Sequence, residues 1–153
     1  MSERIKYPRV APAGYHALAG LSKYVKESGL ETSLVELIEV RASQINGCAF
    51  CLDMHWKNAR AAGESEQRLY SLSAWRETSY YSERERAALA WAEAITQIAN
   101  NDVSDELYNN MQAHFSEKEL VDLTIAVASI NAWNRLVISF RTEPGSYQVP
   151  EQH

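Results

Sequence analysis

Both cysteines of this 153-residue chain lie beside one of its histidines, in the stretch CAFCLDMH. These residues are Cys48, Cys51 and His55. On a helix that turns about 100° per residue, the three side chains fall within one narrow arc together with Leu52 and Ala59. The thiols and the imidazole are therefore expected to face the core. Burying polar groups is costly unless they are paired, so this arrangement indicates a chemical role.

A Cys-x-x-Cys pair at the start of a helix is suited to dithiol–disulfide chemistry. One helical turn can bring the two Cα atoms to about 5.5–6 Å, which an unstrained disulfide prefers. The positive end of the helix stabilises a thiolate. His55 follows Cys51 by four residues, so its imidazole can reach that sulfur directly or through one water. We therefore expect Cys51 to be the nucleophile and Cys48, at the more open helix start, to close the disulfide.

Glu36 can support His55 if the chain reverses between them. The dipeptide Asn46-Gly47 is typical of a turn, and two antiparallel helices would place Glu36 opposite residues near His55. A carboxylate beside an imidazole orients the ring and raises its basicity. The alternative is that Glu36 only completes a helix-capping box that begins at Ser33.

The spacing of apolar residues predicts an all-α bundle of six to seven helices in a single domain over residues 1–153. The core is expected over about 13–141, between an extended N-terminal lead-in and an extended C-terminal tail. The expected helices span about 13–28, 33–45, 48–63, 66–74, 82–100, 104–111 and 116–140. Ser-x-x-Glu capping boxes are expected at Ser33, Ser82 and Ser116.

Composition and charge narrow the classes of function. Hydrophobic residues make up 46% of the chain and charged residues 23%, as in an ordinary soluble protein. A formal charge of −5 and the lack of a basic cluster argue against a nucleic-acid partner. No signal peptide is apparent, and polar residues interrupt the longest apolar stretch, 120–140, so no membrane association is expected. We expect a cytoplasmic location, where a lone cysteine pair is more often catalytic or metal-binding than structural.

The central stretch resembles the signature of a known family, alkylhydroperoxidase D, within the carboxymuconolactone decarboxylase superfamily. The residues that carry the resemblance are Glu36, Ser43, Asn46, Cys48, Cys51 and His55. It is specific over residues 35–63 and continues more loosely through AWRE (74–77) and RERAALAWAEA (84–94) to INAWNR (130–135). The resemblance covers most of the chain and implies an alkylhydroperoxidase D-like helical domain.

The resemblance also implies an activity, the reduction of hydroperoxides through a disulfide–dithiol cycle. Cys51 matches the cysteine that attacks the peroxide and passes through a sulfenic acid. Cys48 matches the resolving cysteine, while Glu36 and His55 match the proton relay. The implied partners are a hydroperoxide substrate, a reducing partner protein or an external dithiol such as a lipoyl group, and further copies of the chain in a homotrimer or homohexamer. No bound cofactor and no metal are expected.

One position departs from the family pattern. Phe50 stands directly before Cys51, where the well-studied peroxidase carries a histidine. An aromatic ring there removes one proton-transfer group from beside the nucleophile.

Other interpretations of the same residues remain open. A decarboxylase-like enzyme could act on a small carboxylated lactone, although the true decarboxylases of the superfamily lack the cysteine pair. A non-enzymatic module could sense redox state, or bind zinc through Cys48, Cys51, His55 and Glu36, without the second Cys/His pair of a structural zinc module. The cysteines could also be inert core residues.

The last expected helix carries polar residues among its apolar ones, including Asn134 and Arg135. Polar groups in a buried helix must find partners. Arg135 could pair with an acidic core residue, and we expect a structural pairing of this kind in preference to a substrate-binding role.

Overall fold

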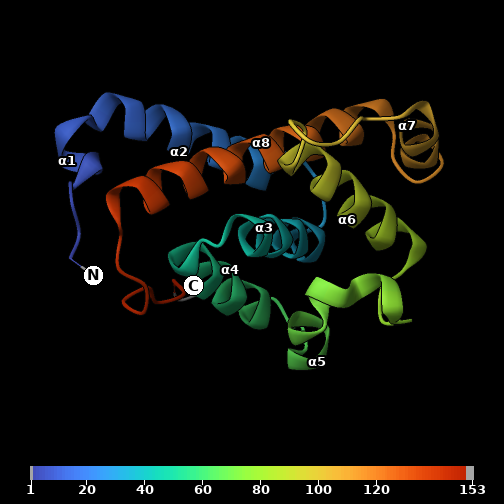
Figure 1. Ribbon diagram of the computed structural model, residues 1–153, viewed down its shortest axis with the longest axis horizontal. Helices are drawn as coiled ribbons and strands as arrows, with labels where there is room; N and C mark the ends of the chain where they lie inside the picture. The colour runs from blue at the N-terminus through green and yellow to red at the C-terminus, as the bar shows by residue number, and fades with distance from the viewer. Residues whose placement is uncertain (1, 151–153) are drawn as a thin grey trace.

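The computed structural model describes residues 2–150, and every regular element in that range is helical (Figure 1). The elements are α1 (Tyr7–Val10), α2 (Pro12–Glu27), α3 (Thr32–Asn46), α4 (Ala49–Ala61), α5 (Glu66–Tyr70), the 3₁₀ helix η1 (Leu72–Glu77), α6 (Glu83–Thr96), α7 (Asp105–Gln112) and α8 (Glu117–Phe140). The described range therefore holds nine helical segments instead of six to seven. The two additions are α1 and η1, which takes the second half of the segment expected at 66–74.

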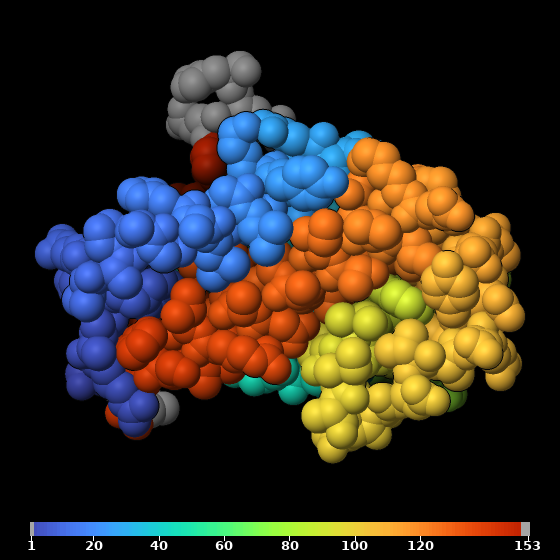
Figure 2. All heavy atoms as spheres, turned by 90° about the horizontal axis from the view of Figure 1, so that it is seen from above, coloured from blue at the N-terminus to red at the C-terminus, as the bar shows by residue number. Residues whose placement is uncertain are grey.

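Two helices, α3 and α8, organise the bundle. The long α8 packs against α2, α3 and α6, and it runs between α2 and α6 across the face shown in Figure 2. The shorter α3 lies at the centre, in contact with α4, α6 and α8. Its apolar side chains Leu37, Ile38 and Val40 are fully buried. The apolar pattern of the sequence thus produces a layered bundle around α3.

The sequence analysis expected an extended N-terminal lead-in, but part of this segment is helical. Pro8 is the second residue of α1 and Pro12 is the first residue of α2. Proline lacks a backbone N–H, and the first turn of a helix has no intrahelical partner for that group. The two prolines therefore begin helices here and do not prevent them. The tail from Thr142 is non-helical through residue 150, as expected.

Two of the three expected capping boxes are present. Ser82 and Ser116 each accept a hydrogen bond from the backbone three residues on, and the glutamate at that position returns one. The box expected at Ser33 is wrong, because the N-cap of α3 is Glu31, two residues before Ser33, and it makes no side-chain cap hydrogen bond. Glu36 is consequently not used as a cap, and its carboxylate is available to the neighbouring helix.

Asn134 and Arg135 have different surroundings. Asn134 is fully buried, donates a hydrogen bond to Ser43 Oγ (3.1 Å) and accepts one from Asn46 Nδ2 (2.8 Å). Arg135 is exposed and donates hydrogen bonds to the backbone and side-chain oxygens of Asn131. The prediction that it pairs with an acidic core residue is therefore wrong. One residue advances a helix by about 100°, which is enough to move the side chain from the core to the surface.

By length and composition α8 is apolar enough to cross a membrane, with a mean hydropathy of 1.3 in its most apolar window. The expectation that no stretch reaches this level was therefore too strict. Leu123, Ala126 and Val127 of α8 are fully buried against other helices, and 39% of its most apolar window as a whole is buried. The cytoplasmic location stays a prediction.

Replacing Asn134 with alanine should destabilise the protein, because Ser43 and Asn46 would each lose a hydrogen-bond partner, Ser43 in a fully buried position. The expected loss in the free energy of unfolding is about 1–3 kcal/mol, measured by urea denaturation. The matched control is Asn109→Ala on the exposed surface of α7, which should change stability by no more than about 0.5 kcal/mol. Equal effects of the two substitutions would contradict this account of the buried network.

Candidate active site

The turn between α3 and α4 brings the candidate residues together. Gly47 ends α3 in the left-handed conformation, with φ of 69°, and its N–H bonds back to carbonyl groups of α3. Residues with a side chain are strained in that conformation, whereas glycine is not. The chain reverses there, and α3 and α4 pack side by side (Figure 1). As predicted for two antiparallel helices, Glu36 lies against His55, with 2.8 Å between Glu36 Oε2 and His55 Nδ1.

The two cysteines form a disulfide at the start of α4, with their Cα atoms 5.3 Å apart. Cys48 is the N-cap of α4, and its sulfur accepts a hydrogen bond from the Cys51 N–H at 3.3 Å. Both residues are buried, 0% and 1% exposed, in an apolar cluster with Ala42, Ile130 and Val137. The expectation that Cys48 is more open than Cys51 is therefore wrong, because α8 covers the start of α4.

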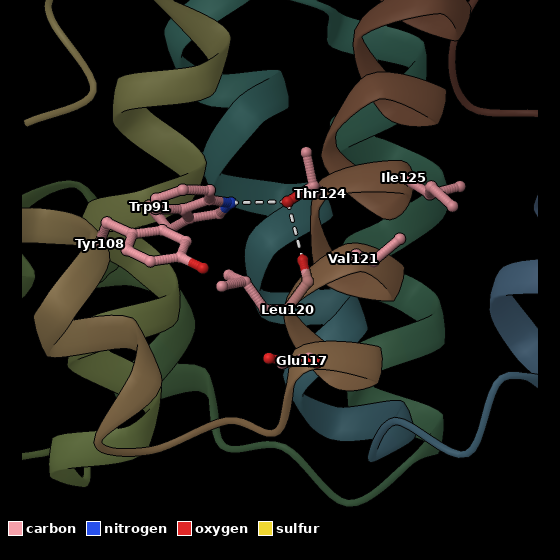
Figure 3. A pocket seen from close by; sticks show the side chains of 7 residues that line it. All are labelled: Trp91, Tyr108, Glu117, Leu120, Val121, Thr124 and Ile125. Atoms are coloured by element: carbon pink, nitrogen blue, oxygen red, sulfur yellow. Dashed lines mark hydrogen bonds between the residues drawn. The ribbon is translucent and has the colours of Figure 1, made fainter. Parts of the chain in front are cut away.

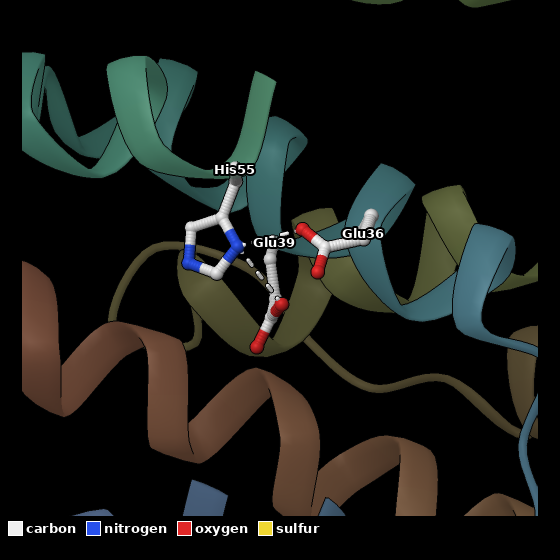
Figure 4. Close-up of side chains that lie close together, drawn as sticks. All are labelled: Glu36, Glu39 and His55. Carbon is white, nitrogen blue, oxygen red and sulfur yellow. Dashed lines mark hydrogen bonds and ion pairs between the residues drawn. The ribbon is translucent and has the colours of Figure 1, made fainter. Parts of the chain in front are cut away.

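His55 lies one turn after Cys51 on α4 and meets two carboxylates, not one. Its Nδ1 is 2.8 Å from Glu36 and 3.1 Å from Glu39. Figure 4 shows both side chains reaching this nitrogen from α3, while Nε2 points away from them. Sequence reasoning missed Glu39. Its spacing of three residues from Glu36 was the available signal, since residues at i and i+3 share a helix face.

The two carboxylates change the protonation of the histidine. Burial by itself would lower the pKa of His55, but the charge of Glu39 and the hydrogen bonds that the ring donates to Glu36 and Glu39 outweigh it and raise the pKa to about 10. Burial also raises the pKa of the Glu36 carboxyl, against the opposing effect of His55. The raised pKa of His55 favours the protonated imidazolium, and the raised pKa of Glu36 favours the protonated carboxyl. The cluster therefore retains an extra proton at neutral pH.

The C-terminal tail lies along α4 near this cluster (Figure 1). The Lys57 ammonium donates to the backbone oxygen of Tyr147 at 2.9 Å, and the Tyr147 hydroxyl donates to Asn58 Oδ1 at 2.7 Å. Burial, together with the nearby negative charge of Glu36, raises the pKa of Tyr147. The tail thus reaches the neighbourhood of the carboxylates and covers part of α4.

The zinc site considered from the sequence is not assembled. The sulfurs of Cys48 and Cys51 are bonded to each other. The group of possible ligand atoms within 4.8 Å of one another, among residues 2–150, consists of Glu36, Glu39 and His55. Both carboxylates approach the same ring nitrogen, which suits a shared proton.

The surroundings of the cysteines are aromatic as well as aliphatic. Phe50 and Trp133 pack against the cysteine cluster, so Phe50 supplies apolar contact where a histidine would supply a proton-transfer group.

A surface pocket of about 470 Å³ lies elsewhere, between α6, α7 and α8 (Figure 3). It is lined by Trp91, Tyr108, Glu117, Leu120, Val121, Thr124 and Ile125. None of the candidate site residues lines this pocket.

The raised pKa of His55 predicts a pH-dependent stability. An unfolded histidine titrates near 6.5, and the folded one at about 10. The stabilisation from the protonated ring is therefore fully present below pH about 6.5 and is lost as the pH rises toward 10. Urea unfolding of the oxidised protein should show the stability advantage over His55→Gln shrinking across this interval. A constant advantage would mean that His55 carries no extra charge in the folded state.

Comparisons with known proteins identify the family to which the α3–α4 hairpin belongs. The model of the carboxymuconolactone decarboxylase family matches residues 12–94, which include the α3–α4 hairpin. The uncharacterized protein YdfG of Bacillus subtilis is 44% identical over 146 residues, covering 95% of this chain and 99% of that protein.

Solved structures show the same fold. ATU0492 of Agrobacterium tumefaciens, named as of unknown function and as a candidate antioxidant defence protein AhpD, has a TM-score of 0.92 and 44% identity, over 95% of this chain and 100% of that one. The debrominase Bmp8, solved with 2,3,4-tribromopyrrole, has a TM-score of 0.80 at 20% identity, over 89% of this chain and 73% of its own, and resembles this chain in fold alone. The chain belongs to the carboxymuconolactone decarboxylase family, as an alkylhydroperoxidase D-like member.

Proposed function

We propose that this protein is a thiol-dependent peroxidase that reduces hydroperoxides through a disulfide–dithiol cycle of Cys48 and Cys51. The observation that carries the proposal is the disulfide at the start of α4, one helical turn before a histidine held by the carboxylates of Glu36 and Glu39. A disulfide that only joined two neighbouring residues of a helix start would not require a proton-carrying cluster beside it.

The proposed oxidation has two steps. The Cys51 thiolate attacks one peroxide oxygen, the O–O bond breaks, and the other oxygen leaves as an alcohol after taking up a proton. Cys48 then attacks the sulfenic acid on Cys51, which forms the disulfide and releases water. One hydroperoxide and two thiols thus give one alcohol, one water and one disulfide. His55, oriented by Glu36, carries the protons.

The return to the dithiol requires an external reductant. We propose a dithiol of the lipoyl type or a reducing partner protein, with no bound cofactor. The Cys51 N–H that points to the Cys48 sulfur stabilises a thiolate there when the disulfide opens. Because both cysteines are buried, a movement at the start of α4 must expose a sulfur to the reductant.

The cysteine roles are tested by single substitutions. After peroxide treatment Cys48→Ser should retain a sulfenic acid on Cys51, seen as a gain of one oxygen by mass spectrometry. Cys51→Ser should not consume tert-butyl hydroperoxide catalytically with dihydrolipoamide as reductant. Phe50→Leu, which keeps both thiols, is the matched control and should turn over.

Three outcomes would contradict these proposals. A sulfenic acid on Cys48 in the Cys51→Ser variant would reverse the two roles, as the N–H bond to the Cys48 sulfur alone would favour. A decarboxylase-like activity on a small carboxylated lactone that survives loss of both cysteines would replace the peroxidase proposal. A disulfide that forms without turnover would instead favour a redox-sensing module.

We also propose that the chain assembles as a homotrimer or homohexamer. Large apolar side chains remain exposed on the single chain, including Val121 and Ile138 of α8, and such groups favour an interface when they gather. Light scattering at micromolar concentration should return three or six times the 17.3 kDa of one chain. A mass of one chain at that concentration would overturn the proposal.

A further inference from the structure

Glu39 is the acidic residue of the site that the catalytic cycle above does not use. We propose that Glu39 is a positioning residue: with Glu36 it keeps the His55 ring doubly protonated, so that Nε2 donates the proton taken up by the leaving alkoxide. The inference rests on the proposed peroxidase function. It assigns His55 the role of an acid at the start of the cycle, whereas a neutral imidazole would begin as a base.

The geometry supports a charged ring. One nitrogen, Nδ1, faces carboxylate oxygens at 2.8 Å and 3.1 Å, and the side chains of His55, Glu36 and Glu39 are 8%, 8% and 14% exposed. One carboxylate is enough to orient an imidazole. Two ionised carboxylates in this confined space repel each other unless a positive charge lies between them. A doubly protonated ring supplies that charge and satisfies both oxygens through the Nδ1 proton.

The other charged groups around the cluster do not replace this charge. Lys26 of α2 acts on Glu36 from a distance and comes last among the influences on its pKa. Lys57 of α4 is engaged by Asp53 and by the tail. The Tyr147 hydroxyl of the tail has a raised pKa and therefore stays neutral at physiological pH. The positive charge nearest the two carboxylates is that of His55 itself.

The proposed step balances in atoms and electrons. The Cys51 thiolate forms a bond to one peroxide oxygen, and the electron pair of the O–O bond goes to the departing alkoxide. The alkoxide takes the Nε2 proton and leaves as an alcohol. The ring is then neutral, and its remaining proton on Nδ1 is held by Glu36 and Glu39. A proton from solvent recharges the ring and balances the one that the Cys51 thiol released on ionising.

A charged ring has a second consequence for the nucleophile. Cys51 precedes His55 by one helical turn, and a positive charge near a thiol favours its thiolate. The same pair of carboxylates would therefore promote ionisation of Cys51 and supply the proton for the leaving group. The position next to Cys51 holds Phe50, which can do neither. By keeping the ring charged, Glu39 thus allows His55 both to favour the Cys51 thiolate and to protonate the leaving group.

The decisive variant is Glu39→Gln in the full chain, with Glu39→Asp as the conservative rescue. The matched control is Glu77→Gln, which removes the charge of an exposed residue at the end of η1. The first readout is the ¹³C chemical shift of the His55 ring in the oxidised protein, identified by comparison with His55→Gln. In the wild type and in Glu77→Gln the ring should stay protonated through pH 8.5. In Glu39→Gln its midpoint should fall by at least one pH unit, and Glu39→Asp should restore most of the shift.

The second readout is the pH profile of peroxide consumption with a dithiol reductant. Up to pH 8.5, Glu39→Gln should lose activity as the pH rises through its lowered His55 midpoint, in proportion to the fraction of rings that have lost the proton, since general acid catalysis is worth about 10²–10⁴-fold. The wild type and Glu77→Gln should show no such loss. An unchanged His55 midpoint, or an unchanged pH profile in an active Glu39→Gln variant, would overturn the inference. If the wild type consumes no peroxide, the proposed function fails, while the ring titration still decides whether Glu39 charges His55.

Discussion

The reversal of the chain at Gly47 is the constraint on which the site depends. A left-handed residue at this position ends α3 and allows α4 to begin immediately, with Cys48 as its N-cap. A side chain at this position would cost roughly 1–2 kcal/mol in backbone strain. The same reversal fixes the register of the two helices, and the register places Glu36 opposite His55. A change in the length of this turn would separate the disulfide from its neighbouring charges or rotate one of them away.

The start of α4 and its next turn lie in two different environments. At its start α4 places the disulfide in an apolar cluster against α8, where Phe50 adds aromatic contact. One turn later it presents His55 to the carboxylates of α3. The polar network of Asn134, which joins α8 to the end of α3, helps to hold the three helices in these positions. Apolar packing therefore excludes water from the sulfurs, while the charged groups remain together on the neighbouring turn.

The sequence by itself determined the features that depend on short spacings along one chain segment. The intervals between Cys48, Cys51 and His55 place them on one helical face in any helix. The boxes at Ser82 and Ser116 are local hydrogen-bond patterns, and both form as predicted. Even the pairing of Glu36 with His55 followed from the sequence, because the tight turn between them leaves the register almost no freedom.

Only the tertiary structure decided how these groups are covered and charged. Burial of Cys48 depends on where α8 crosses the start of α4, and the exposure of Arg135 depends on which face of α8 meets the bundle. The position of Tyr147 depends on the path of a non-helical tail. The approach of Glu39 to the same nitrogen as Glu36 depends on the distance between α3 and α4. These are contacts between elements, and their distances follow from how side chains of several helices pack together, which no local spacing specifies.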